Sequence, residues 1–361
     1  MGRGTQTMDS ASIVADTARK IFAATCDPHT VNRAKDEAWK KPAWAALEDA
    51  GLPLAWVPDA LGGAGAEVSD GFAVLREAGR FAVPLPVAET LLAGWLLAQA
   101  GVSSPRGAMA CGPAREGDRV ILSKTGTLTG RLRAVAFARG AGHIAVLAER
   151  EAGGRAVALV EAGAARIADG NSIAGDSLNA VSFESARPIA VKDAPAGLDS
   201  AALLLMGAAA RSVQMTGALE AILDLSVAYA NERVAFERPI AKFQAVQHNL
   251  ARLAGETAAA IAAAGSAADA IANAKAFDEA VFLEAASAKI RVGEAAGEGA
   301  AIAHQVLGAI GFTKEHTLHR FTQRLWAWRD DFGNESQWAV KLGRLVAAKG
   351  ADGLWPMLAA R

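Results

Sequence analysis

Two short segments in the second half of the chain carry residue types suited to binding a bulky planar or phosphorylated ligand. In Tyr229–Leu250, YANERVAFERPIAKFQAVQHNL, we expect one helix to end at Arg233 and a loop to carry Phe236. A second helix is then expected to open with Phe243 and Gln244. The simpler interpretation of this segment alone is that the loop arginine forms a surface ion pair.

The second segment, His304–Glu315 (HQVLGAIGFTKE), reads as a helix that runs into a turn containing Gly308, Gly311 and Phe312. Glycine at a helix end lets the backbone come close to a large ligand, because no Cβ stands in the way. Its simpler interpretation is a glycine that ends a helix.

No other motif in the chain indicates a familiar chemistry. The sequence lacks a GxxxxGK[ST] phosphate loop, an HExxH pair, a GxGxxG fingerprint between strand and helix, and a GxSxG elbow. His316 and His319 have helical i,i+3 spacing, but no Asp or Cys accompanies them at ligand spacing, so we expect no metal site. Cys26 and Cys111 are far apart and without a CxxC partner, which excludes a disulfide framework.

Composition narrows the classes of partner. The 361 residues contain 37 Lys+Arg and 38 Asp+Glu, so no basic excess is available to neutralise a nucleic-acid backbone. The longest apolar runs, Leu91–Ala98 and Ala201–Ala210, are shorter than the roughly 20 residues that a bilayer requires. The beginning of the sequence also lacks the pattern of a secretory signal. We therefore expect a cytoplasmic protein that binds neither membrane nor nucleic acid.

Patterning along the chain predicts a mostly helical protein with a small β-domain. Alanine dominates the 52% hydrophobic fraction, and it is the strongest helix former. Residues 1–104 are expected to form an N-terminal helical domain, 105–196 a β-domain and 197–361 a C-terminal four-helix bundle, with helices near 199–232, 242–274, 278–308 and 315–350. We expect Thr257–Ala274, with Asp269 as its one charged residue, to be buried on most sides.

The β-domain is expected to be a small antiparallel sheet or barrel. Its expected strands are Arg119–Leu122, Arg133–Phe137, His143–Ala148, Ala156–Glu161 and Ala180–Glu184.

Together, the two C-terminal segments resemble the acyl-CoA dehydrogenases. That family carries an RxxF loop before an FQxxQ helix, followed later by a QxxGGxGFxxE turn. Val57–Gly65 (VPDALGGAG) is similar to the family's N-terminal PxxxGGxG turn, and the α–β–α order also agrees. The resemblance implies an N-terminal helical domain, a middle β-domain and a C-terminal four-helix domain, usually in a tetramer with FAD at a subunit interface.

The resemblance also implies which residues hold the cofactor. Arg233 would pair with the FAD pyrophosphate, for which a planar guanidinium fork is well suited. Ala309 replaces the family's usual second glycine in the segment that approaches the adenosine of a partner subunit's FAD. The implied FAD-site residues are Arg233, Phe236, Phe243, Gln244, Gln305, Gly308, Ala309, Gly333 and Asn334.

The glutamate that serves as the base in this family is missing from both positions where members carry it. Counting from Gly311 along the chain places Phe332 where most members have the glutamate of a YEGT-like segment. Counting back from Arg233 places Gly207 and Ala208 at the alternative position. Of the nearby carboxylates, Asp330, Asp331 and Glu335, we expect Asp331 to substitute because it lies one residue from the usual position; each also has the simpler interpretation of a solvated charge or an ion pair.

The expected β-domain departs from the family as well. The TExxxGSD-like loop and the WIT-like strand of the family hydrogen-bond the flavin ring. The corresponding segments, Cys111–Asp118 and Ala134–Gly140, have neither the hydroxyl nor the tryptophan.

The sequence is compatible with three functions. The first is an FAD-dependent acyl-CoA dehydrogenase for an unusual, bulky acyl group, with electron-transfer flavoprotein as its acceptor. The second is a non-catalytic subunit of a heteromeric acyl-CoA dehydrogenase, similar to those that degrade sterol side chains. The third is an acyl-CoA or flavin binder without a redox role.

Overall fold

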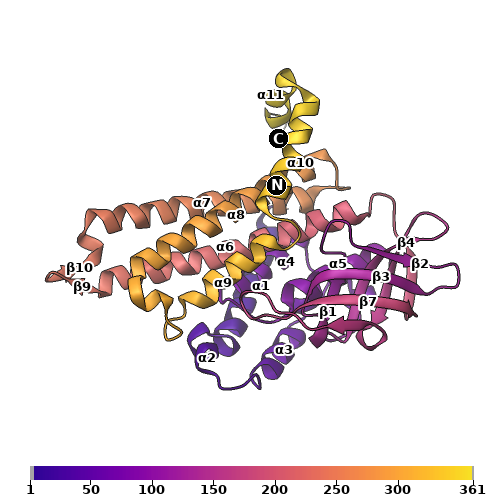
Figure 1. Ribbon diagram of the computed structural model, residues 1–361, viewed down its shortest axis with the longest axis horizontal. Helices are drawn as coiled ribbons and strands as arrows, with labels where there is room; N and C mark the ends of the chain where they lie inside the picture. Colours follow the sequence, from indigo (N-terminus) through magenta and orange to yellow (C-terminus); the bar gives the residue numbers. More distant parts are fainter. Residues whose placement is uncertain (1–3, 360–361) are drawn as a thin grey trace.

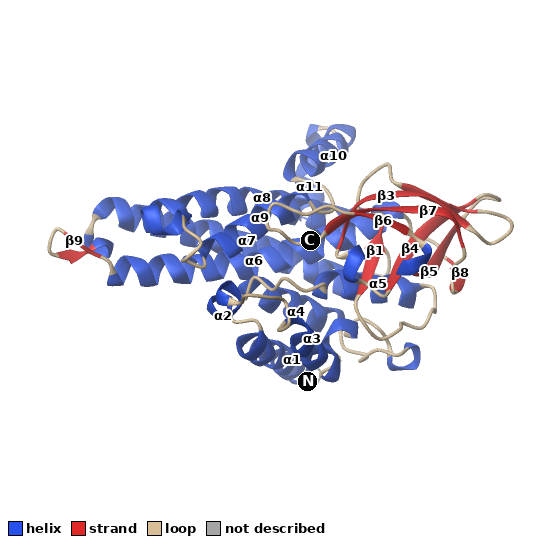
Figure 2. Ribbon diagram, turned by 60° about the horizontal axis from the view of Figure 1, so that its bottom comes forward, coloured by secondary structure: helices blue, strands red, loops and turns tan. Residues whose placement is uncertain are grey.

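The computed structural model describes residues 4–359, and its eight-stranded sheet lies at the opposite end of the molecule from the tips of the long helices. In Figures 1 and 2 the sheet forms one end, and the long helices α6, α7 and α8 extend from it to the other end. The N-terminal helices lie alongside the middle of this axis. The helical protein with a small β-region that the sequence predicts is therefore confirmed.

The N-terminal helices follow the apolar spacing of the sequence. They are α1 (Gly4–Thr25), α2 (Pro28–Arg33), α3 (Lys40–Asp49), α4 (Val68–Arg80) and α5 (Val87–Gln99). Pro84 and Pro86 separate α4 from α5, because proline cannot continue a helix. Every residue from Val87 to Leu97 is buried, since α5 lies between the sheet and the bundle and contacts β1, β4 and α6.

Eight strands form one mixed sheet. They are β1 (Met109–Gly112), β2 (Arg119–Leu122), β3 (Leu128–Ala136), β4 (His143–Arg150), β5 (Arg155–Glu161), β6 (Arg166–Ala168), β7 (Leu178–Ala186) and β8 (Ala190–Asp193), in the order β6-β7-β3-β2-β4-β5-β8 with β1 beside β4. Most pairs are antiparallel, but β1 and β2 both run parallel to β4. The expectation of a purely antiparallel sheet is thus wrong in its centre.

The central strand β4 is buried on both faces, which explains its continuous apolar run. Ile144 and Val146 belong to a core enclosed by the sheet itself. Ala145 and Leu147 face the opposite way, into the main core that also contains α5. Alternate residues of one strand therefore connect the β-domain to the helical body.

The C-terminal bundle is built on α6 (Ser200–Glu232), which contacts α4, α7 (Gln244–Asn273), α8 (Glu279–Leu307) and α9 (Leu318–Asp330). Although α6 is long and apolar enough to cross a membrane, its apolar window is completely buried inside the protein. Glycines permit close packing between α4 and α6: a Cβ on Gly79 would lie 1.7 Å from the carbonyl oxygen of Gln214, and one on Gly217 would lie 1.9 Å from that of Arg76.

Two helical expectations need correction. The expected helix 315–350 is broken into α9 and α10 (Glu335–Lys349), and a further helix, α11 (Ala351–Ala359), follows Gly350. The part of α7 that was expected to be buried on most sides is buried along one face, at Thr257, Ala260, Ala264, Ala267 and Ile271. These positions recur every three or four residues, because only one side of α7 packs on the bundle.

Candidate functional site

The break between α9 and α10 is a rigid turn, Asp331–Asn334, which contains the position where the family's base was expected. Phe332 has a positive φ of 55°, a conformation that a bulky side chain rarely adopts, and Gly333 follows with φ 94°. The indole Nε1 of Trp338 donates to the Phe332 carbonyl at 3.0 Å. Asn334 caps α10 by accepting from the Gln337 amide at 3.0 Å. These bonds hold the Phe332 side chain in one direction.

The ring of Phe332 packs directly on Gly207 of α6. Phe332 is buried, and a Cβ on Gly207 would lie 2.3 Å from its Cδ1 atom. The two alternative positions of the family's glutamate, identified by counting along the sequence, are therefore in contact in space. Where the family has a glutamate side chain at one of these two positions, this chain has the phenyl ring of Phe332 and the hydrogen atom of Gly207.

A buried arginine on α6 organises the charges beside this contact. Arg211 donates from Nε to Asp331 Oδ2 at 2.9 Å and from Nη1 to Gln214 Oε1 at 2.5 Å, and Nη2 donates to Glu89 of α5. The side chains of Arg211 and Glu89 are 3% and 6% exposed, and that of Asp331 is 14% exposed. Burial raises the pKa of Glu89, and the charge of Arg211 opposes that rise.

Arg211 and Glu89 are not among the site residues expected from the sequence, although the sequence contains a signal for both. Arg211 is the one charged residue in the run Ser200–Leu219, and Glu89 stands alone in the apolar segment Val87–Ala98. A charge inside a helix that is buried all round requires a partner, because an isolated buried charge is strongly destabilising.

Little space remains where a flavin ring would lie against the sheet. The cavity at this point has a volume of about 10 Å³ and is lined by Glu89, Leu92, Cys111, Ala114, Ala134, Ala136, Arg211, Asp331 and Phe332. This volume admits at most about one water molecule. A cavity of this size does not hold an isoalloxazine ring.

Lys289 of α8 binds backbone carbonyl groups in the last turn of α9, next to the turn Asp331–Asn334. Its side chain is fully buried, and Nζ donates to the carbonyl oxygens of Trp328 at 2.9 Å and Arg329 at 2.6 Å, the last carbonyls of α9. Burial lowers the pKa of Lys289 to about 7, with Asp331 opposing the shift and Arg211 adding to it. Lys289 thus caps the C-terminal end of α9, which is followed directly by Asp331.

The other predicted cofactor residues lie at the far end of the bundle. Arg233 is exposed at the end of α6, where the hairpin of β9 (Val234–Ala235) and β10 (Arg238–Pro239) leads into α7. Phe236, at the hairpin tip, is 89% exposed with φ 49°, and its ring centroid is 6.2 Å from that of Phe243. Gln244 is exposed at the first position of α7.

The second predicted segment, His304–Glu315, lies at the same end of the bundle as the β9–β10 hairpin. Gln305 is exposed in the last turn of α8, Gly308 ends the helix with φ 65°, and Ala309 is exposed in the turn η6 (Gly308–Phe312). Phe312 is 74% exposed, and its outward ring stacks on His304 with centroids 4.5 Å apart. An exposed arginine, amides and aromatic faces suit the phosphates and ring of a dinucleotide.

The structure thus divides the predicted FAD residues into two groups that one cofactor cannot bridge within a single chain. Gly333, which Asn334 follows, borders a cavity together with Arg133 of β3. Arg233 lies directly between α6 and the hairpin strand β9, and Gly308 directly after α8. Along α6 the distance from Gly207 to Arg233 is about 39 Å, at about 1.5 Å per residue. An exposed arginine and aromatic rings, which suit part of a dinucleotide, are found in the group at the hairpin end.

Comparisons with known proteins identify the class. A sequence model of the acyl-CoA dehydrogenase N-terminal domain matches residues 8–105, and one of the acyl-CoA dehydrogenase C-terminal domain matches residues 197–329. The chain belongs to the acyl-CoA dehydrogenase family. FAD is the cofactor that this membership assigns to it.

Curated relatives and solved structures agree. The chain is 28% identical to the acyl-CoA dehydrogenase IpdE2 of Mycobacterium tuberculosis, over 88% of this chain and 91% of the relative. Its fold matches a chain of the ChsE4-ChsE5 complex of M. tuberculosis with a TM-score of 0.83 and 24% identity, over 94% and 98% of the two chains. PigA with FAD and proline has the same fold, with a TM-score of 0.81 and 16% identity over 94% of this chain and 98% of PigA.

The contact between positions 207 and 332 can be tested with a double-mutant cycle. We expect Gly207→Ala to lower the free energy of unfolding by about 1–3 kcal/mol, because its methyl group would overlap the ring of Phe332. In a Phe332→Ala background the same change should be neutral or stabilise by up to about 1 kcal/mol, since alanine is the better helix former. Urea denaturation measures both values, with Gly265→Ala in open space as the control. Equal effects in the two backgrounds would contradict the contact.

The buried lysine predicts a specific pH dependence of stability. The unfolded chain keeps the Lys289 proton up to about pH 10.4, whereas the folded chain releases it above about pH 7. The unfolded state therefore binds more protons between these values, and this group makes the unfolding free energy rise with pH, by up to about 1.4 kcal/mol per unit. Lys289→Met should remove that rise between pH 7 and 9, while Lys20→Met, at an exposed position, should keep it. A slope unchanged by Lys289→Met would show that the lysine stays charged when buried.

Proposed function

We propose that this chain is a subunit of a heteromeric acyl-CoA dehydrogenase, in which a homologous chain supplies the catalytic base. The observation that carries this proposal is the Phe332 ring packed on Gly207, which fills both positions of the family's glutamate with groups that cannot accept a proton. General base catalysis requires an acceptor within hydrogen-bond reach of the substrate. Neither residue provides one.

The substitute base expected from the sequence, Asp331, is engaged elsewhere. Its carboxylate accepts a hydrogen bond from the buried guanidinium of Arg211. The cavity that it borders has a volume of about 10 Å³, which leaves no room for a thioester beside it. A rigid turn and the cap from Lys289 stabilise this closed arrangement.

The chain retains candidate FAD-binding residues of the family at the hairpin end of the bundle. Arg233 there would pair with the pyrophosphate of FAD, and Phe236, Phe243, Gln244, Gln305, Gly308 and Ala309 would surround the rest of its non-reacting half. FAD, the acceptor of the substrate hydride in this family, would then lie between this end and the flavin-ring pocket of the partner. The chain's role would be to bind and orient the cofactor.

Relatives with paired chains support this arrangement. The fold is shared with the ChsE4-ChsE5 complex and with the Tcur3481-Tcur3483 steroid ACAD G363A variant, which matches with a TM-score of 0.80 at 24% identity over 94% of this chain and 98% of that one. Both names describe two different chains together. By this analogy, the complex would oxidise an acyl-CoA with a bulky, sterol-derived acyl group and pass electrons to electron-transfer flavoprotein in the cytoplasm.

The visible spectrum and an anaerobic titration with acyl-CoA thioesters test the proposal. The chain purified alone should be colourless, and yellow protein that bleaches with substrate should form only when a glutamate-bearing homologue is co-expressed. A chain that is yellow and bleaches alone would contradict the subunit role and favour an independent dehydrogenase. In that event, loss of flavin reduction in Asp331→Asn would identify Asp331 as the base, and an unchanged rate would exclude it.

Arg233 provides a second test, in the assembled complex. Arg233→Ala should weaken FAD retention at least about tenfold, because a bidentate contact to phosphate is lost. Measuring bound flavin after dialysis gives the result. Arg131→Ala, which removes an exposed arginine on β3, serves as the matched control. Equal flavin content in the two variants would contradict the assigned role of Arg233.

A further inference from the structure

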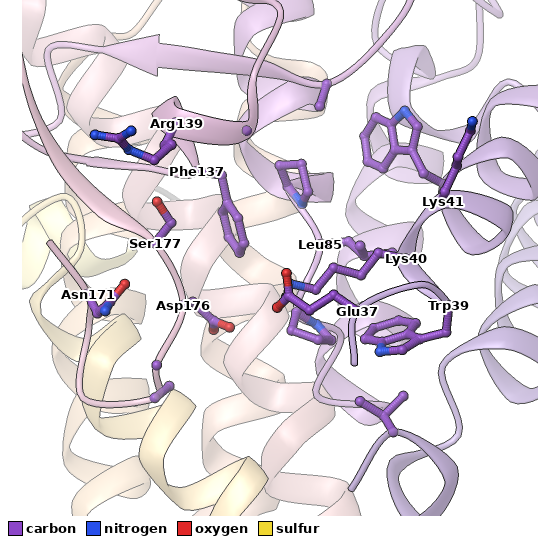
Figure 3. A pocket seen from close by; sticks show the side chains of 18 of the residues that line it. Glu37, Trp39, Lys40, Lys41, Leu85, Phe137, Arg139, Asn171, Asp176 and Ser177 are labelled. Carbon is purple, nitrogen blue, oxygen red and sulfur yellow. Dashed lines mark hydrogen bonds and ion pairs between the residues drawn. The ribbon is translucent and has the colours of Figure 1, made fainter. Parts of the chain in front are cut away.

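A second, much larger cavity opens where the N-terminal helices, the β-domain and α9 meet. Its volume is about 1000 Å³, and it shares no lining residue with the closed cavity at Phe332. Figure 3 shows Trp39, Lys40 and Lys41 on one side of it and Arg139, Asn171 and Ser177 on the other. We name this space the Arg320–Arg324 cleft, after the two α9 side chains that line it. None of the predicted FAD residues borders it.

Two arginines and one carboxylate lie together in this cleft, and only one of the arginines forms an ion pair with it. Arg324, whose side chain is 4% exposed, donates from Nη2 to Asp176 Oδ1 at 2.6 Å and from Nη1 to the carbonyl oxygen of Arg320 at 3.0 Å. Its buried Nε has no hydrogen-bond partner. The buried Nε of Arg320 also lacks a partner, and no ion pair joins Arg320 to any residue in the described range 4–359. Burial and the charge of Arg324 lower the pKa of Arg320 to about 10, and the charge of Asp176 opposes this shift only in part.

The remaining charges of the cleft do not supply the missing anion. Its other acidic side chains are already engaged: Glu37 with Lys40, Asp169 with Arg139, Asp36 with the amide of Ala38, and Glu48 with the amide of Gly107. Lys35 and Lys41, at the exposed margin, have no ion pair with a described residue. The unpaired groups of the cleft are therefore cationic.

Aromatic side chains line the same space. The ring of Phe137 points into the cleft in Figure 3, and its backbone has φ 55°. Trp39 and Trp44 line the cleft from the N-terminal domain, and the buried Nε1 of Trp44 has no hydrogen-bond partner. A strained backbone that directs a ring into a cavity is typical of ligand sites. The cleft thus offers flat apolar faces, the unused indole donor of Trp44, the unpaired guanidinium of Arg320 and the free Nε of Arg324.

We propose that the Arg320–Arg324 cleft binds a small aromatic phosphate of the nucleoside monophosphate class. Its phosphate would bind the guanidinium of Arg320 and the free Nε of Arg324, and its base would pack against Phe137 and Trp39. The proposal is independent of the subunit role, because the cleft and the Arg233 end lie in different parts of the chain.

Adenosine monophosphate is the probe that tests the proposal on the full-length protein. Isothermal titration at low salt should show that it binds at least about tenfold more tightly than adenosine or inorganic phosphate, and it should quench tryptophan fluorescence. Raising the ionic strength should weaken binding of the phosphate-bearing probe and leave adenosine unchanged. No binding of adenosine monophosphate at low salt would overturn the proposal.

Variants then locate the site. Arg320→Met should weaken binding at least about tenfold, and Arg320→Lys should have an intermediate effect, because lysine keeps the charge but not the planar fork. Phe137→Leu should weaken binding of the nucleotide but not of inorganic phosphate. Arg131→Met should bind like the unmodified protein, and circular dichroism confirms that each variant is folded. Binding that survives Arg320→Met would place the nucleotide elsewhere, such as at the Arg233 end, and refute the proposal.

Discussion

The buried guanidinium of Arg211 connects the parts of this protein that would otherwise surround a substrate. It bonds Glu89 of α5, Gln214 of its own helix and Asp331 at the end of α9. A buried arginine must have such partners, since an uncompensated charge in the interior is destabilising by several kcal/mol. The charges satisfy one another, and the space between them is consequently closed. Phe332 and Gly207 complete this closure with apolar contact.

The closed centre changes how the family's fold is used. In this chain α6 has the closed cavity near one end and the exposed Arg233 hairpin at the other. Tight packing and internal ion pairs stabilise the first end. At the second end the side chains are exposed and can contact a ligand. This division agrees with the proposed role of the chain as a subunit that helps to bind the cofactor.

The elements could be predicted from the sequence because alanine-rich helical periodicity is a local property. The expected helices 242–274 and 278–308 correspond to Gln244–Asn273 and Glu279–Leu307. The break at Asp331 was missed, although Gly333 and the pair Asn334 and Gln337 carry the signature of a helix cap. Burial of α7 was overestimated, because composition does not say which face meets a neighbour.

The sequence by itself determined the family, the order of helices and strands, and the absence of a glutamate at positions 207 and 332. These follow from motifs and spacing along one chain. Only the tertiary structure decided that these positions touch, that Arg211 binds Asp331, and that Arg320 and Arg324 border a cleft with Phe137. The reason is that each of these features joins residues far apart in sequence, whose distance depends on how the helices and the sheet pack together.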